Sequence, residues 1–216
     1  MPYHVINKIV NCSDFSKLEK YISKEDNTEF LDFDKIIPMP KELDIQSGSD
    51  GELGRAYLLK EGTDYISKEE VIKRIEERTK EERNEILRLG QAYIDNKSKY
   101  GFPTWYEWRN YNWGTKWNSY DNKIKRNKEG KILFIEFQTA WAVPEPILEK
   151  LAKECDFTIL YADEDIGRNC GIGKANNGSF SFTDAGCKIF ARMVWNCKNT
   201  PESISKLIDM CEFGCR

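Results

Sequence analysis

Two strand–helix–strand patterns, separated by a long helical segment, constrain the fold of this chain more than any other feature. In the first pattern, HVINKIV (4–10) alternates and is rich in β-branched residues, which predicts a strand. Ser13 can cap a helix that runs through Ile22. The segment EFLDFDKIIPMP (29–40) then begins as a strand, and its prolines stop it because proline cannot donate a hydrogen bond to a ladder.

The second pattern lies in the C-terminal half of the chain. KILFIEFQTAW (131–141) predicts a strand, PILEKLAKEC (146–155) predicts a short helix, and DFTILYA (156–162) predicts another strand. Two such halves give a four-stranded antiparallel sheet with helices on one face. We therefore predict an α+β fold with a ferredoxin-like, split βαβ antiparallel sheet.

Additional helices are predicted between the two patterns and at the end of the chain. Three Ser/Thr-x-x-Glu capping signals, which begin at Ser49, Ser67 and Thr79, mark helix starts within an insertion at about 49–100. A C-terminal helical tail is expected at about 197–216. All 216 residues are expected to form a single ferredoxin-like domain that carries this insertion and this tail.

Four blocks of the sequence resemble a known family. FDKIIPMPKEL (33–43), WYEWRNYNWGTKWN (105–118), FQTAWAVPEPI (137–147) and YADEDIGRNCG (161–171) are similar, in this order, to the YubB ferredoxin-like family. That family occurs largely in phages, plasmids and integrated elements. The resemblance implies a ferredoxin-like fold, in agreement with the strand and helix pattern, and it brings neither an established activity nor assigned catalytic residues.

The composition excludes several classes of protein. A net charge of -3 gives no strong field for non-specific binding to duplex nucleic acid. No apolar run approaches the roughly 20 residues that a membrane helix needs, and the N-terminus lacks a signal-peptide pattern, so we expect a cytoplasmic protein. None of the seven cysteines forms a CxxC pair and His4 is the one histidine, so neither a metal site nor a cofactor is expected.

The segment WYEWRNYNWGTKW holds four of the six tryptophans. One interpretation is that these rings form part of the core and meet Trp141, since such rings bury large areas. The other is a partly open pocket, in which aromatic rings stack on a ligand and cations neutralise a phosphate. Both interpretations can hold for different rings. The candidate ligand-binding residues are Trp105, Trp108, Arg109, Tyr111, Trp113, Lys116 and Trp117.

A local excess of positive charge follows this segment. The range 116–131 holds six basic and two acidic residues, and 123–131 is predicted to be a loop before the strong strand. Either the loop is simply solvated, or it contributes to the binding of a small anion. An extended basic face, which duplex binding usually requires, is not indicated.

An acidic turn is predicted at the end of the last strand of the second pattern. Asp163, Asp165, Arg168 and Asn169 are candidate ligand-binding residues there, because sites often lie at strand ends. Adjacent carboxylates can hold Mg²⁺. Alternatively, the turn is structural and Arg168 pairs with one of the aspartates.

Three functions are compatible with these patterns. The first is a non-enzymatic binding protein from a mobile element that captures a small, anionic, nucleotide-like ligand, for instance to sequester a host signal. The second is a protein–protein inhibitor whose aromatic segment contacts a host factor, since Trp, Tyr and Arg are enriched at interaction hot spots. The third is a phosphoesterase in which Asp163, Glu164 and Asp165 hold a metal. We expect a binding protein rather than an enzyme.

Overall fold

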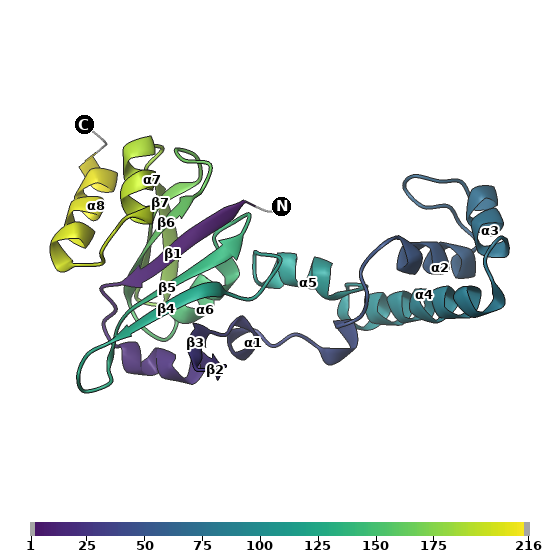
Figure 1. The fold of residues 1–216 in the computed structure, drawn as a ribbon, viewed down its shortest axis with the longest axis horizontal. Coiled ribbons are helices and arrows are strands. Elements are labelled where there is room, and N and C mark those ends of the chain that lie inside the picture. The colour runs from purple at the N-terminus through teal and green to yellow at the C-terminus, as the bar shows by residue number, and fades with distance from the viewer. Residues whose placement is uncertain (1–2, 214–216) are drawn as a thin grey trace. The chain divides into compact units, whose positions relative to one another are not determined.

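The computed structural model describes residues 3–213, and the chain divides into two compact units (Figure 1). The ferredoxin-like unit comprises Met1–Pro38 and Asn110–Arg216. The helical unit comprises Met39–Arg109. Each unit has a core of buried apolar side chains of its own.

A six-stranded sheet forms the centre of the ferredoxin-like unit, and all its neighbouring strands are antiparallel. The strand order is β4-β5-β1-β6-β7-β8. The first four of these strands have the order expected for a ferredoxin-like sheet, and the β7–β8 hairpin extends it beyond β6. The strands are β1 (His4–Val10), β4 (Tyr120–Arg126), β5 (Ile132–Ala140), β6 (Phe157–Asp163), β7 (Cys170–Asn176) and β8 (Ser179–Asp184).

The second strand of the ferredoxin-like core is not the one that the sequence pattern predicted. The place expected for 29–40 is taken by β4, and residues 123–126 of β4 belong to the segment predicted to be a loop. The strand β3 (Thr28–Leu31) instead pairs with β2 (Ile22–Glu25) in a separate two-stranded sheet. β4 lies at the sheet edge, exposes alternate polar residues and contains a bulge after Tyr120, so its hydrophobic periodicity is weak.

Helices cover both faces of this sheet (Figure 1). One face packs against η1 (Phe15–Tyr21), α1 (Phe33–Ile36) and α6 (Glu145–Ala152), and the ring of Phe33 contacts Phe137 of β5. On the other face, α7 (Lys188–Trp195) and α8 (Pro201–Phe213) pack on β6, β7 and β8.

The C-terminal helices complete a core rather than extending away from the unit. Ile204, Leu207 and Cys211 of α8 are buried in the same cluster as Phe190 and Val194 of α7. Strand residues of β1, β6 and β7 form the opposite wall of this cluster. The helical tail expected at about 197–216 therefore packs on the sheet over its described part, whereas Cys215 lies outside the described residues.

The helical unit contains η2 (Lys41–Leu43), α2 (Ser49–Leu59), α3 (Lys68–Glu76), α4 (Lys80–Tyr100) and the first part of α5 (Trp105–Asn112). Two of the three predicted caps are confirmed. Ser67 accepts a hydrogen bond from the backbone of Glu70, and Thr79 forms a reciprocal capping box with Glu82. The prediction for Ser49 is wrong, because Gly48 is the N-cap and Ser49 is the first helical residue.

Two glycines bring α2 and α4 into backbone contact. A Cβ atom on Gly90 would lie 2.2 Å from the carbonyl carbon of Gly54, and one on Gly54 would lie 2.1 Å from the oxygen of Ile86. Neither neighbour is a flexible side chain, so the helices would have to separate. The close approach lets Leu53, Ala56, Val71, Ile75 and Ile86 pack as the core of the helical unit.

Replacing Gly90 by alanine is expected to destabilise the helical unit by about 1–3 kcal/mol, in spite of the better helix propensity of alanine. Chemical denaturation followed by far-UV circular dichroism measures this loss. Ser98→Ala, at an exposed position of the same helix, is the control and should stabilise the unit by about 0.5 kcal/mol at most, through helix propensity alone. A Gly90→Ala chain that unfolds at the wild-type denaturant concentration or higher would contradict the close backbone contact.

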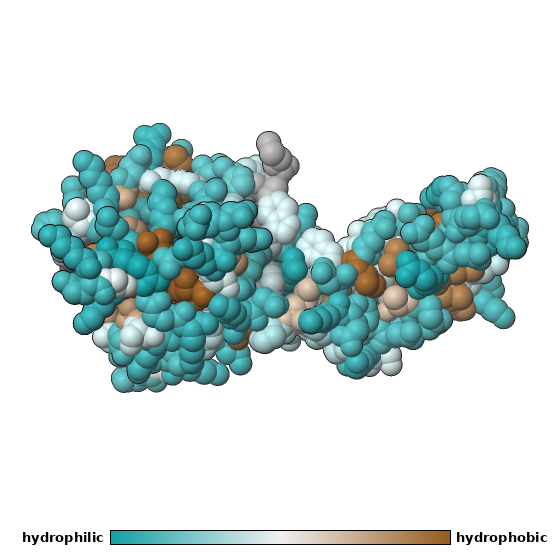
Figure 2. All heavy atoms as spheres, turned by 60° about the horizontal axis from the view of Figure 1, so that its bottom comes forward, coloured by the Kyte–Doolittle hydropathy of each residue, from teal (hydrophilic) through white to brown (hydrophobic). Residues whose placement is uncertain are grey.

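On the face that Figure 2 shows, the surface of each unit is predominantly hydrophilic, with small apolar patches between hydrophilic side chains. Within residues 3–213, no helix combines the length and the apolar character that crossing a membrane requires.

Candidate ligand-binding site

The tryptophan-rich segment is divided between the two units, because the boundary falls within α5. Trp105, Trp108 and Arg109 belong to the helical unit. In this part, the guanidinium of Arg109 lies 5.1 Å from the ring centroid of Trp105, and Trp108 is buried. The other four candidates, Tyr111, Trp113, Lys116 and Trp117, belong to the ferredoxin-like unit.

Trp113 is a core residue of the ferredoxin-like unit. Its side chain is 1% exposed, and its indole Nε1 donates a hydrogen bond of 2.9 Å to the carbonyl oxygen of Ile37. The ring also packs edge to face against Phe33, with centroids 6.0 Å apart. The core interpretation therefore describes Trp113, whereas Tyr111 is 72% exposed.

Lys116 lies against two tryptophan rings at one end of the sheet. Its Nζ atom is 4.9 Å from the ring centroid of Trp117 and 5.4 Å from that of Trp141. Trp141 follows β5, adopts a left-handed backbone conformation with φ of 70°, and is 40% exposed. A cation within about 6 Å of a ring centroid is attracted to the face of that ring.

Backbone contacts hold these side chains in place. The Oγ1 of Thr115 accepts a hydrogen bond of 3.0 Å from the amide of Ala140 and donates one of 2.9 Å to its carbonyl oxygen. The amide of Trp141 donates a hydrogen bond of 2.8 Å to the carbonyl oxygen of Tyr3. Thr115 precedes Lys116 and Ala140 precedes Trp141, so these hydrogen bonds keep Lys116 and Trp141 at the same end of β5.

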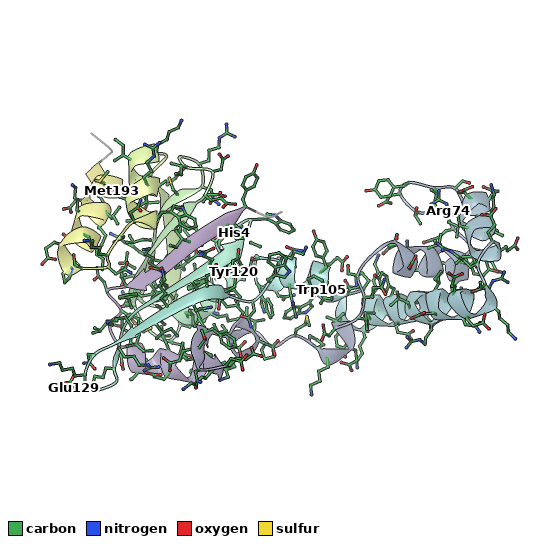
Figure 3. All side chains as sticks on the ribbon, in the orientation of Figure 1. His4, Arg74, Trp105, Tyr120, Glu129 and Met193 are labelled. Carbon is green, nitrogen blue, oxygen red and sulfur yellow. The ribbon has the colours of Figure 1, made fainter. Side chains whose placement is uncertain are left out.

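Tyr120 and His4 extend the site along the same end of the sheet (Figure 3). The ring of Tyr120 packs edge to face on Trp117 with centroids 6.1 Å apart, and its hydroxyl lies 2.7 Å from Nδ1 of His4. Burial, with a further contribution from the charges of Asp121 and Glu164, raises the pKa of Tyr120 to about 12. The phenol is therefore protonated at neutral pH.

The acidic turn reaches this end of the sheet through Glu164. The backbone amide of His4 donates a hydrogen bond of 3.0 Å to Oε1 of Glu164, and the amide of Glu164 donates one of 2.9 Å to the carbonyl oxygen of His4. We refer to Lys116, Trp117, Tyr120, Trp141 and His4, with Glu164 beside them, as the sheet-end cluster. It joins β1, β4, β5 and β6, and sequence reasoning did not include His4, Tyr120 or Trp141 among its candidates.

The aspartates of the turn have structural contacts. Asp163 is buried, and its Oδ1 accepts a hydrogen bond of 2.9 Å from the amide of Asp165. Arg168 and Asn169 are exposed, and no ion pair joins Arg168 to either aspartate among the described residues. Residues 3–213 contain no group of three His, Cys, Asp or Glu side chains arranged to hold a metal ion.

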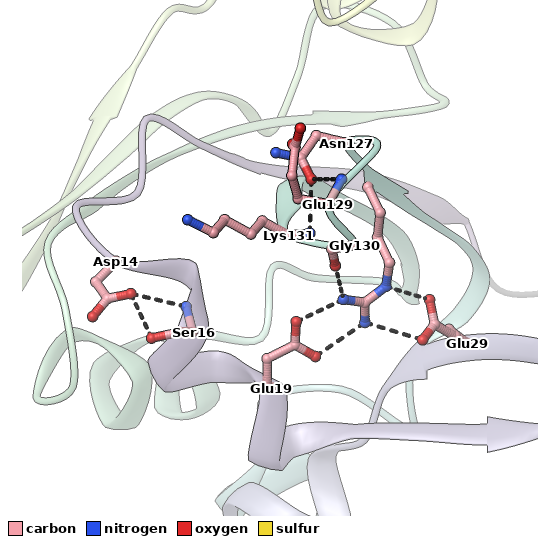
Figure 4. A network of polar contacts seen from close by, with 9 residues as sticks. Asp14, Ser16, Glu19, Glu29, Asn127, Glu129, Gly130 and Lys131 are labelled. Atoms are coloured by element: carbon pink, nitrogen blue, oxygen red, sulfur yellow. Dashed lines mark hydrogen bonds and ion pairs between the residues drawn. The ribbon is translucent and has the colours of Figure 1, made fainter.

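Part of the basic run is neutralised within the fold. The Arg126 guanidinium forms ion pairs with Glu19, at 2.6 Å, and with Glu29, at 3.0 Å (Figure 4). The hydrogen bonds with Glu19 and Glu29 raise the pKa of Arg126. Lys123 pairs with Glu136 at 2.8 Å. The predicted excess of positive charge therefore includes residues that hold strands together.

The helical unit has a cavity of about 450 Å³ that the sequence patterns did not predict. This volume is within the range typical of small-molecule pockets. Arg55 at its wall pairs with Glu52 and Glu61, and Arg74 pairs with Glu70. Its lining includes Ser49, Leu53, Arg55, Tyr65, Arg74 and Arg78.

Comparison with known proteins supports the fold. Residues 112–199 match the family model of the ferredoxin-like domain in Api92-like protein. This range contains β4, β5, α6, β6, β7, β8 and α7, and it includes every member of the sheet-end cluster except His4. The match supports a ferredoxin-like family, but the name of the matched family is not YubB. Neither the curated proteins nor the solved structures gave a match.

Proposed function

We propose that this protein is a non-enzymatic binding protein that captures a small, anionic, nucleotide-like ligand at the sheet-end cluster. The observation that carries the proposal is the position of Lys116, whose ammonium lies near the rings of both Trp117 and Trp141 at a partly exposed end of the sheet. This arrangement presents a positive charge and an accessible aromatic face next to each other.

Each component matches one part of a nucleotide. A base stacked on an aromatic side chain contributes about 1–3 kcal/mol. Phosphate oxygens accept charge-assisted hydrogen bonds from an ammonium group such as that of Lys116. The protonated hydroxyl of Tyr120 and the ring of His4 add polar groups for orientation. In a mobile element, such a protein would serve counter-defence by sequestering a host signalling nucleotide.

The alternatives have weaker support. A phosphoesterase would need the carboxylates of Asp163, Glu164 and Asp165 to converge on a metal, but Asp163 is buried while the other two are exposed, and residues 3–213 contain no such group of three. A protein–protein inhibitor is favoured only by exposed aromatic side chains such as Tyr111. That function predicts that Tyr111 contributes to the binding of a macromolecule and that the protein binds no nucleotide.

The test is calorimetric titration of the full chain with a panel of mono-, di- and cyclic nucleotides, followed by variants. Trp141→Asn removes the ring and keeps a residue that tolerates the left-handed conformation. It should weaken binding by about 5- to 150-fold, the equivalent of one lost stacking interaction. Lys116→Ala should weaken binding by about 10-fold or more, because a charge-assisted hydrogen bond is lost.

Lys125→Ala is the matched control, since Lys125 is an exposed lysine of the same sheet. It should bind as the wild-type chain does. A nucleotide that binds wild type and both sheet-end variants equally would contradict the proposed site. Loss of binding in Arg78→Ala would instead place the ligand in the cavity of the helical unit.

A further inference from the structure

Two cysteines that are distant in the sequence lie in contact on the ferredoxin-like unit. Their Sγ atoms are 3.3 Å apart, and both are free thiols. Cys12 follows β1 and is partly exposed, whereas Cys155 follows α6 and is buried. One thiol is thus open to small reagents, and the second lies directly behind it.

The backbone next to each thiol fixes this contact. The amide of Ser13 donates a hydrogen bond of 2.8 Å to the carbonyl oxygen of Asp156. The amide of Asp156 donates one of 3.1 Å to Oγ of Ser13. Because a disulfide has a bond length of about 2.05 Å, its formation needs the two sulfurs to approach by roughly 1.3 Å from this contact.

The surroundings distinguish the two thiols chemically. The hydrogen bond between the two thiols lowers the pKa of Cys12 against the opposing effect of burial, and Lys17 contributes in the same direction. The same hydrogen bond, together with burial, raises the pKa of Cys155. The thiolate is the reactive form of cysteine, so the accessible thiol is also the more nucleophilic one.

We propose that Cys12 and Cys155 form a reversible redox modification site, in which Cys12 reacts with a peroxide and Cys155 resolves the product as a disulfide. The Cys12 thiolate attacks one peroxide oxygen, the O–O bond breaks, and sulfenic acid and hydroxide form. The sulfur of Cys155 then attacks the sulfenic sulfur, which releases water and closes the disulfide. Each disulfide consumes one peroxide and two thiols, and a dithiol reductant reverses the reaction.

The test uses the full chain, fully reduced and then exposed to hydrogen peroxide in equimolar amount. Thiol alkylation and peptide mass spectrometry should show a Cys12–Cys155 cross-link and the loss of these two alkylation sites. Cys155→Ser should instead accumulate a sulfenic acid at Cys12 that a dimedone probe traps. Cys12→Ser should slow oxidation of Cys155 by about 10-fold or more, since the reactive thiolate is gone.

Cys197→Ser is the matched control, because Cys197 is also a partly exposed free thiol. It should form the cross-link at the wild-type rate. Complete alkylation of Cys12 and Cys155 after peroxide treatment would overturn the proposal, as would oxidation of Cys197 at an equal rate. Circular dichroism of each serine variant confirms that a negative result reports on chemistry and not on unfolding.

Discussion

Replacing Trp113 by alanine is expected to lower the free energy of unfolding of the ferredoxin-like unit by about 3–5 kcal/mol. The ring is almost completely buried, contacts Phe33, and donates a hydrogen bond to Ile37. Truncation therefore leaves a large cavity and an unpaired carbonyl oxygen. Chemical denaturation followed by far-UV circular dichroism measures the change without relying on the fluorescence of the deleted ring.

Two further variants separate the contributions to this effect. Trp113→Phe keeps an aromatic ring but removes the indole donor, so it should cost less than alanine, about 1–3 kcal/mol. Trp141→Asn removes a ring that is 40% exposed and should cost less than either. If Trp113→Ala proves as stable as wild type, the ring is not part of the core and becomes a ligand-binding candidate again.

The second large effect is expected at a buried ion pair on the α7/α8 face of the sheet. Lys8 is 1% exposed, and its Nζ atom lies 2.9 Å from Oε2 of Glu136 and 3.2 Å from the carbonyl oxygen of Cys197. Asn199 donates a further hydrogen bond of 3.1 Å to Glu136. Lys8→Met removes the buried ammonium but leaves the carboxylate of Glu136 buried. This change should destabilise the ferredoxin-like unit by about 3–5 kcal/mol.

Control variants test whether burial causes the effect. Lys123 also contacts Glu136, but its side chain is 74% exposed, so Lys123→Ala should cost at most about 1 kcal/mol. The double variant Lys8→Met/Glu136→Leu removes both buried charges and should recover much of the lost stability. Equal losses in Lys8→Met and Lys123→Ala would contradict a special role for the buried pair.

The carboxylate of Glu136 makes the stability of the ferredoxin-like unit depend on pH. Burial raises the pKa of Glu136, but hydrogen bonds from Lys123, Lys8 and Asn199 outweigh burial and leave it below the ordinary value. A group with a lowered pKa in the folded state stabilises above its unfolded pKa, about 4.3 for glutamate. This contribution should therefore disappear as the pH falls from about 4.3 through the folded pKa, and denaturation at a series of acidic pH values measures it.

Local signals in the sequence predicted much of the fold. The strong strand at 131–141 corresponds to β5, the strand at 156–162 corresponds to β6, and the capping box at Thr79 begins α4. Predictions failed where distant contacts decide the conformation. Ser13, expected to cap a helix, accepts a hydrogen bond from Asp156, while Asp14 caps the short η1 helix.

The same distinction applies to the candidate site. Lys116 and Trp117 stood out because they belong to a dense aromatic segment. His4 and Tyr120 did not, because their contact joins residues 116 positions apart, and a lone strand histidine usually has a packing role. The helical-unit cavity has no sequence signal at all, since most of its lining residues are polar or charged and resemble an ordinary solvated surface.

The bulge that follows Tyr120 in β4 also affects how copies of the chain meet. β4 is an edge of the sheet, and an edge strand can template pairing with another chain and so promote aggregation. The register shifts after Tyr120, and Asn122 accepts a hydrogen bond from the amide of Leu31. Lys123 and Lys125 bring charge to the rest of this edge. An added strand would meet an interrupted, charged ladder, so the edge resists amyloid-like growth.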